Sequence, residues 1–220
     1  GRHAVRRDGH ALLLAAGALC NDAVLERDAT SQGGLHTVGD PTEGALLVAA
    51  AHFGVWKASL EQSFPRIGEV PFSSERRCMT TVHHVELPLP AENGLRPLAE
   101  CLHGIPHAAV AFTKGAVDSV LHKSDQVWID GAAQPLTAAW RRRIEAASDR
   151  LAGEGLRTLG LAWRTMETAP AHDAWETVEQ HLTFIGLVGM IDPPRPEVKQ
   201  AVLQCQTAGT PPVMITGDHP

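Results

Sequence analysis

The pattern of the last forty or so residues constrains the fold more than any other feature of the chain. Leu182–Met190 is a continuous apolar run of strand length. The next segment, 192–196, contains three prolines, which fix their own φ and bias the preceding residues to extended conformations. A helix is expected over Glu197–Thr207 and a buried strand over Val213–Ile215. Because a helix followed by a buried strand is typical of an α/β layer, a second domain is expected here.

The remainder of the chain has a different pattern. β-branched and apolar runs predict strands there, with helices between them. The expected strands are Leu35–Val38, Met79–Glu86, Ala108–Thr113, Gln126–Asp130 and Thr158–Trp163, and the expected helices are Gly9–Leu19, Pro41–Phe53 and one carrying Leu136, Trp140 and Ile144. We therefore expect an α+β fold, a mainly antiparallel sheet flanked by helices over residues 1–190, followed by part of a second domain over 191–220.

Composition excludes several function classes. The 25 acidic and 19 basic residues give a net charge of −6, whereas nucleic-acid binders usually carry a basic face. The longest apolar runs, 11–20 and 182–191, are shorter than the ~20 residues that a membrane-spanning helix needs. The four cysteines form no C-x-x-C pair, so no zinc site is expected and the thiols are expected to be reduced.

Phe72 stands in an unusually polar setting. Its neighbours are Ser73, Ser74, Glu75, Arg76 and Arg77, just before an expected strand. An aromatic ring beside cations suits a nucleotide, because the ring can stack on a base while the cations attract phosphate. The alternative is that Phe72 is an ordinary core residue, and the spacing leaves both interpretations open.

Lys114 follows an expected strand, and Gly115 is expected to open a helix. A lysine beside a helix N-terminus can bind an anion, although an exposed lysine before a glycine turn has the same pattern. Neither G-x-x-x-x-G-K-[ST] nor G-x-G-x-x-G occurs in the chain. If a nucleotide binds, a different kind of fold must hold it.

Thr216 and Asp218 close the chain's last apolar run, VMITGD. In open α/β sheets, ligands sit beyond the carboxyl ends of the strands, which would place this hydroxyl and this carboxylate at a phosphate site. A surface turn is the alternative, since Gly-Asp is common in turns.

Taken together, these segments resemble the cytoplasmic nucleotide-binding domain of P-type cation-transporting ATPases. Six stretches match in order, and they cover nearly the whole chain: CNDAVL, GDPTEGALL, PFSSERRCMTTV, FTKGA, GLRTLGLAWR, and GLVGMIDPPRPEV leading to MITGDHP. The resemblance implies that residues 1–190 form the nucleotide-binding domain. It also implies that residues 191–220 are a partial Rossmann-like phosphorylation domain.

The resemblance also implies which residues touch ATP. Phe72 would stack on adenine and Glu43 would lie near the adenine edge. Arg76, Arg77 and Met79 would shape the pocket, with Lys114, Gly115 and Arg157 near its inner wall and the phosphates. Ser74 stands where animal calcium pumps often carry arginine. Asp192, Thr216 and Asp218 would belong to the hinge and the phosphorylation domain, near the phosphates and Mg²⁺.

The chain departs from the family in ways that bear on activity. Val117 and Asp118 stand where the family often has Pro-Glu, and the Asp-Lys-Thr-Gly-Thr that carries the phosphorylated aspartate does not occur in this sequence. We therefore expect the chain to bind ATP without turning it over. It would do so as the cytoplasmic part of an integral membrane pump that works through an aspartyl-phosphate intermediate.

The expected partners are the remaining phosphorylation, actuator and transmembrane domains of the same pump. CNDAVL and GDPTEGALL look most like calcium pumps, and a proton or magnesium pump is the alternative within the family. A non-catalytic nucleotide-sensing module and a free-standing phosphatase are the alternatives from other classes.

Overall fold

The structure, a computed structural model, describes residues 5–27, 35–85, 109–170, 175–191 and 196–213. Its contacts divide the chain into two compact units, Gly1–Met190 and Ile191–Pro220.

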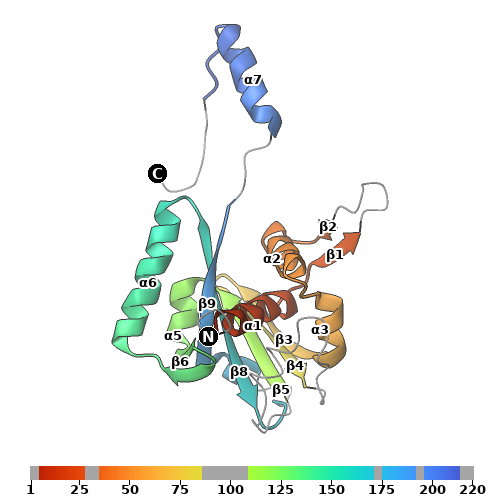
Figure 1. Ribbon diagram of the computed structural model, residues 1–220, viewed down its shortest axis with the longest axis vertical. Coiled ribbons are helices and arrows are strands. Elements are labelled where there is room, and N and C mark those ends of the chain that lie inside the picture. Colours follow the sequence, from red (N-terminus) through yellow and green to blue (C-terminus); the bar gives the residue numbers. More distant parts are fainter. Residues whose placement is uncertain (1–4, 28–34, 86–108, 171–174, 192–195, 214–220) are drawn as a thin grey trace. The chain divides into compact units, whose positions relative to one another are not determined.

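A seven-stranded mixed sheet forms the centre of the first unit (Figure 1). Its spatial order is β3-β4-β5-β8-β9-β6-β7. The strands are β3 (Arg66–Ser73), β4 (Cys78–His84), β5 (Ala109–Gly115), β6 (Ser124–Ile129), β7 (Ala132–Pro135), β8 (Arg157–Met166) and β9 (Leu182–Met190). Neighbours pair antiparallel except β6 and β9, which are parallel. A separate antiparallel pair is formed by β1 (Val24–Arg27) and β2 (Leu35–Val38).

Helices cover both faces of the large sheet. The N-terminal helices α1 (Val5–Leu19), α2 (Pro41–His52) and α3 (Lys57–Ser63) lie on one side. The helices α5 (Val117–His122) and α6 (Ala138–Gly153) lie on the other, as does the short 3₁₀ helix η1 (Trp175–Glu179). The two sides are called the N-terminal face and the η1 face below.

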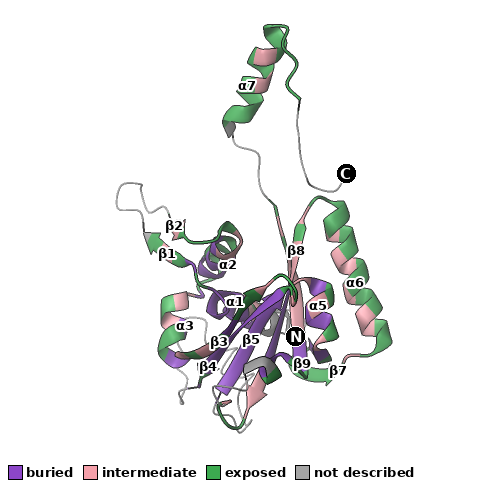
Figure 2. Ribbon diagram, turned by 180° about the vertical axis from the view of Figure 1, so that it is seen from behind, coloured by how far each residue is buried: buried purple, intermediate pink, exposed green. Residues whose placement is uncertain are grey.

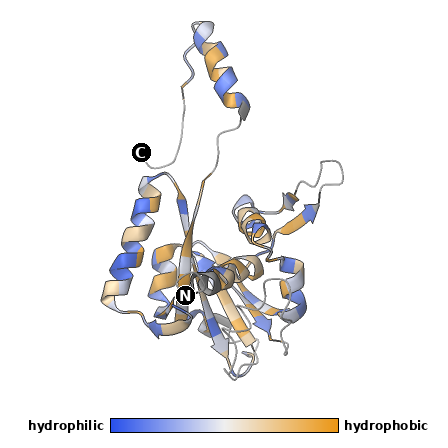
Figure 3. Ribbon diagram, in the orientation of Figure 1, coloured by the Kyte–Doolittle hydropathy of each residue, from blue (hydrophilic) through white to orange (hydrophobic). Residues whose placement is uncertain are grey.

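The core consists of separate clusters on the two faces because side chains alternate along each strand. On β8, Leu161 and Trp163 pack with Leu12 of α1, whereas Ala162 packs with Phe184 under α5 and α6. Figure 2 shows the resulting buried centre, with central strands in purple and the outlying helix α6 largely exposed in green. Figure 3 shows the same contrast in hydropathy, since the central strands are orange while α6 carries hydrophilic blue stretches.

The expected α+β class is confirmed by this mixed sheet with flanking helices. Two local features differ from the expectations. Phe72 precedes the expected strand, β4, but lies itself at the end of a strand that was not expected, β3, and Gly115 does not open a helix but ends β5, with α5 beginning at Val117. The parallel pairing of β6 with β9 was not expected from the sequence.

Gly115 is required by a close approach of two backbones. A Cβ placed on Gly115 would come within 2.4 Å of the Arg77 carbonyl oxygen and 2.8 Å of Cys78 Cα, so the neighbouring strand would have to move. Gly115→Ala is therefore expected to lower the free energy of unfolding by about 1–3 kcal/mol, the usual range for overpacking.

Gly153 is the matched control for that substitution. An added Cβ there meets no atom within 4 Å, and the residue ends the exposed helix α6. Gly153→Ala should leave stability unchanged or raise it by up to about 1 kcal/mol. Urea unfolding of the two variants measures the difference, and equal stabilities would contradict the proposed close approach.

The second unit contains helix α7 (Pro196–Thr207), which ends before Gly209 in a left-handed conformation, φ +73°. Val213 is exposed and has no regular secondary structure. The remainder of the expected strand 213–215 lies outside the described residues, and so do Asp192, Thr216 and Asp218.

Candidate functional site

Antiparallel pairing brings distant segments together at one end of the strands. The end of β3, the start of β4, the end of β5 and the start of β8 all meet there. In the ladder, Met79 lies opposite Lys114, and Lys114 lies opposite Leu161. Residues that are far apart in the sequence thus meet at one end of the central strands. This end lies near the N-terminus of α2, as the distance of 3.5 Å between Arg157 Nη1 and Thr42 Oγ1 shows.

Helix α2 begins with a strong N-terminal signal. Asp40 is its N-cap, with an extended backbone, and its carboxylate accepts hydrogen bonds from the backbone N–H groups of Thr42 (2.8 Å) and Glu43 (3.2 Å). Pro41 occupies the first helical position, where its missing N–H costs nothing. Desolvation raises the pKa of Asp40, but these hydrogen bonds outweigh it and hold the pKa below its usual range. The cap fixes Glu43 in the first turn.

Glu43 and Lys114 form an ion pair between α2 and β5. Their side chains are 13% and 10% exposed, respectively. The second carboxylate oxygen of Glu43 accepts from the backbone N–H groups of Asp22 (2.9 Å) and Ala23 (3.0 Å), so the carboxylate is held on both sides. The buried amide of Asn21 donates to the Glu43 carbonyl oxygen at 2.9 Å and ties the same loop to α2.

Phe72 is an exposed aromatic residue on an edge strand, with 63% of its surface accessible. Val70 pairs with Thr80 and Ser73 with Cys78, which leaves Pro71 and Phe72 together opposite Met79. Two residues opposite one constitute a β-bulge. Bulges change the direction of side chains and are common next to functional sites. Met79 itself is buried in the core cluster of the N-terminal face. The interpretation of Phe72 as a core residue was therefore wrong.

Arg76 and Arg77 lie in the turn that joins β3 and β4 and bind carboxylates on other elements. Arg76 Nη1 donates to Glu179 of η1 at 2.6 Å, and Arg77 Nη2 donates to Asp118 of α5. Arg77 has a left-handed backbone, φ +49°, while Ser74 is exposed in the same turn. The turn thus stands beside the Phe72 bulge, with both guanidinium groups anchored to acidic side chains.

Glu179 was missed by the sequence analysis although it is the most buried carboxylate described, 2% exposed. One of its oxygens accepts from Arg76 and from Thr80 Oγ1 (3.0 Å). The other accepts from Lys123 Nζ (3.0 Å) and from the Cys78 thiol (3.6 Å). Burial raises the pKa of Glu179, but the Arg76 and Lys123 hydrogen bonds outweigh it, so the pKa is lowered and the group is ionised at neutral pH.

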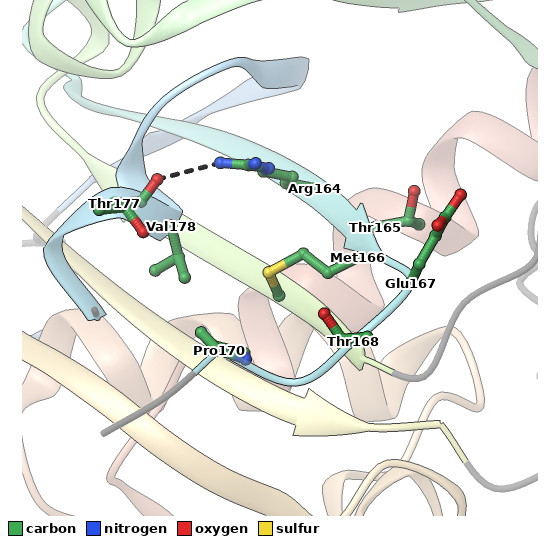
Figure 4. Close-up of a pocket in the computed structure, with 8 residues that line it drawn as sticks. All are labelled: Arg164, Thr165, Met166, Glu167, Thr168, Pro170, Thr177 and Val178. Carbon is green, nitrogen blue, oxygen red and sulfur yellow. Dashed lines mark hydrogen bonds between the residues drawn. The ribbon is translucent and has the colours of Figure 1, made fainter. Parts of the chain in front are cut away.

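A cavity of about 380 Å³ lies elsewhere, beside the end of β8 and η1 (Figure 4). Its lining residues include Arg164, Met166, Glu167 and Thr177, and none of the residues expected from the sequence. Arg164 is engaged with backbone, because its Nη1 donates to the Thr177 and Gln180 carbonyl oxygens at 3.0 and 2.9 Å. The cavity is therefore not the site that the sequence indicated.

Comparison with known proteins shows the family of this chain. The sequence profile of the family "P-type ATPase, cytoplasmic domain N" matches residues 10–197. The chain belongs to this family. As a P-type ATPase domain N, it is 37% identical over 98% of its length to a calcium-transporting ATPase 1 of Bacillus cereus, and 38% identical over 94% to a calcium-transporting ATPase of Bacillus subtilis. It is 31% identical over 92% to an endoplasmic reticulum-type calcium-transporting ATPase 3 of Arabidopsis thaliana.

This domain N spans about a fifth of the length of those relatives, 21%, 21% and 20% respectively. Within the described part of the chain, no helix has the length and apolar character to cross a membrane. The same residues contain no group of three His, Cys, Asp or Glu side chains that could hold a metal ion.

Proposed function

We propose that this domain N binds ATP where the strand ends meet the N-terminus of α2. The proposed binding residues are Phe72, Glu43, Met79, Lys114 and Arg157. The observation that carries the proposal is the exposed ring of Phe72, in a bulge opposite Met79, whose partner on the next strand is the ion-paired Lys114. An aromatic ring that is largely exposed to solvent suits base stacking. The exposed cationic side chain of Arg157 can bind a phosphate oxygen, while the charge of Lys114 is balanced by Glu43.

Each residue has a separate task in this proposal. Phe72 stacks on adenine, and Glu43, held by Lys114 and two backbone N–H groups, lies at the adenine edge. Arg157 at the start of β8 and Lys114 lie toward the phosphates. Ser74, Arg76 and Arg77 form the turn that borders the ring, and Gly115 allows this turn to approach β5.

The parent protein is proposed to be an ATP-driven cation pump that forms an aspartyl phosphate. Calcium is the proposed cation, because relatives named calcium-transporting ATPases match nearly the whole chain. Residues 191–220, including Asp192, Thr216 and Asp218, are proposed to belong to a Rossmann-like phosphorylation domain. Mg²⁺ is proposed to act with ATP there, outside the part of the chain that the structure describes, and the actuator and transmembrane domains are the proposed partners. The 220-residue chain is expected to bind ATP without turnover.

Phe72→Ala tests the site directly. Because stacking on an aromatic side chain contributes about 1–3 kcal/mol per base, the dissociation constant for ATP should rise by about five- to 150-fold. Isothermal titration calorimetry or NMR titration measures the change. Since Phe72 is exposed, the free energy of unfolding should change by no more than about 0.5 kcal/mol.

Phe53→Ala is the matched control, because this phenylalanine is 70% exposed at the C-terminal cap of α2, the end opposite Glu43. It should leave ATP affinity unchanged. The proposed site would be wrong if the two variants bound ATP equally well, or if millimolar ATP left the NMR signals of Phe72, Glu43, Lys114 and Arg157 unmoved.

A further inference from the structure

Arg76 is placed to connect the buried Glu179 to the backbone that carries Phe72. Its Nη1 donates to Glu179 Oε1 at 2.6 Å, while Nη2 donates to the carbonyl oxygen of Pro71. Pro71 immediately precedes Phe72 and shares its bulge. The planar guanidinium can bridge the two acceptors because its donors are fixed in a fork.

Other hydrogen bonds hold the main chain of the turn itself. The Arg76 backbone N–H donates to Ser73 Oγ (3.1 Å), the Arg77 N–H donates to the Ser73 carbonyl oxygen (2.7 Å), and the Ser119 hydroxyl donates to the Arg76 carbonyl oxygen. These bonds hold the main chain of the turn. The guanidinium of Arg76 is the group that reaches back to the residue before Phe72.

Glu179 is fixed independently of that turn. Thr80 and Lys123 donate to its two oxygens at 3.0 Å each, and Thr80 Oγ1 lies 2.8 Å from Thr113 Oγ1 in the centre of the sheet. A carboxylate held by β4 and α5 is a rigid support for a side chain that reaches it from the turn. We infer that Glu179 is a positioning residue for nucleotide binding, acting through the Arg76 guanidinium to fix the bulge that presents Phe72.

This inference rests on the proposed function, and it assigns to Arg76 a role other than phosphate contact. Arg76→Lys is the decisive substitution. The ammonium group keeps the charge that Glu179 requires but lacks the fork that also reaches Pro71. Part of the stacking contribution should be lost, so affinities for ATP and for adenosine should both fall by about five- to tenfold. The NMR amide signals of Phe72 and Ser73 should shift.

Arg141→Lys is the matched control, because the Arg141 guanidinium also bridges two acceptors, the carbonyl oxygens of Leu121 and Ser124 at 2.7 and 2.8 Å, but lies outside the cluster of Arg76, Glu179 and Pro71. It should lower stability while changing either affinity by less than about twofold. If the Arg76 guanidinium served stability alone, Arg76→Lys and Arg141→Lys would have the same effect on affinity, and the inference would be overturned.

A double-variant cycle with Phe72→Ala separates positioning from direct contact. When the ring is absent, Arg76→Lys should cause no further loss of affinity. An equal loss in both backgrounds, or a loss for ATP without one for adenosine, would mean that Arg76 touches the phosphates and would overturn the inference alone. Failure of the unmodified chain to bind ATP, or full affinity in Phe72→Ala, would overturn the proposed function as well.

Discussion

Lys114→Met is expected to lower the free energy of unfolding by about 3 kcal/mol, because it leaves the Glu43 carboxylate largely buried without its cation. Both side chains are nearly excluded from solvent, and removing one partner of such a pair costs about 3–5 kcal/mol. The lower end of this range applies because two backbone N–H groups still bind Glu43. Urea unfolding at neutral pH measures the change.

The pair of Arg77 and Asp118 is the matched control, because its side chains are 54% and 64% exposed. Arg77→Met should lower stability by no more than about 1 kcal/mol, as is usual for exposed ion pairs. Combining Lys114→Met with Glu43→Gln should recover part of the loss, since the unpaired charge is then removed. Equal losses for Lys114→Met and Arg77→Met, or strict additivity in the double variant, would contradict a buried, coupled pair.

Elements with strong local signals were predicted well from the sequence. Asp40 and Pro41 mark the start of α2, and the structure ends that helix one residue before the expected Phe53. The run Leu182–Met190 became β9 with the expected bounds, because an apolar run of strand length, followed by prolines, can be assigned as a strand without knowledge of its partners.

Elements with weak local signals were missed. Strand β3 contains Gly68 and Pro71, which disfavour a strand, and both lie where its register with β4 shifts. Its position at the sheet edge allows Pro71, since a missing N–H there breaks no required ladder bond. Helix α3 has only seven residues, and its N-cap residue, Trp56, makes no side-chain capping hydrogen bond. Tertiary packing determines both elements, and single-sequence patterns do not contain it.

In the candidate site, too, residues with a local sequence signal were predicted and residues that depend on long-range contacts were not. Phe72, Lys114 and Glu43 were expected from their motifs, but the ion pair of Glu43 with Lys114 depends on how α2 packs against β5. Glu179 gave no signal, because its partners Arg76 and Thr80 lie about a hundred residues earlier and its own 3₁₀ turn has no recognisable pattern. Long-range partners of this kind become visible only when the strand order is known.

Acidification from pH 7 to pH 5 is expected to lower the free energy of unfolding by about 2 kcal/mol through His83. Burial, the largest effect, lowers the pKa of His83 from 6.5 to about 4, although the hydrogen bond with Phe64 acts in the opposite direction; the charges of Arg66 and Lys57 lower the pKa further. Between pH 6.5 and about pH 4, His83 is therefore mostly protonated in the unfolded chain and mostly neutral in the folded chain. Stability is fully present above the unfolded pKa and is lost as the pH falls through this window.

Both ring nitrogens of His83 have hydrogen-bond partners in the folded protein. Nδ1 lies 2.8 Å from the Phe64 carbonyl oxygen, and Nε2 lies 2.9 Å from Thr81 Oγ1. Because the Phe64 carbonyl oxygen can only accept, Nδ1 carries the proton of the neutral ring, and burial together with the charges of Arg66 and Lys57 disfavours a second proton on Nε2. The pKa values of Glu179, Asp40 and Asp118 are lowered, so the stability they contribute is lost only at more acidic pH.

His83→Gln should therefore flatten the dependence of stability on pH between 7 and 5, whereas the same change at the exposed His84 should leave the slope unaltered. Urea unfolding at several pH values gives the slopes. An NMR titration of the unmodified protein measures the His83 pKa directly, including in the case that His83→Gln does not fold. A measured pKa near 6.5, or equal slopes for the two variants, would mean that the buried ring does not couple folding to protonation.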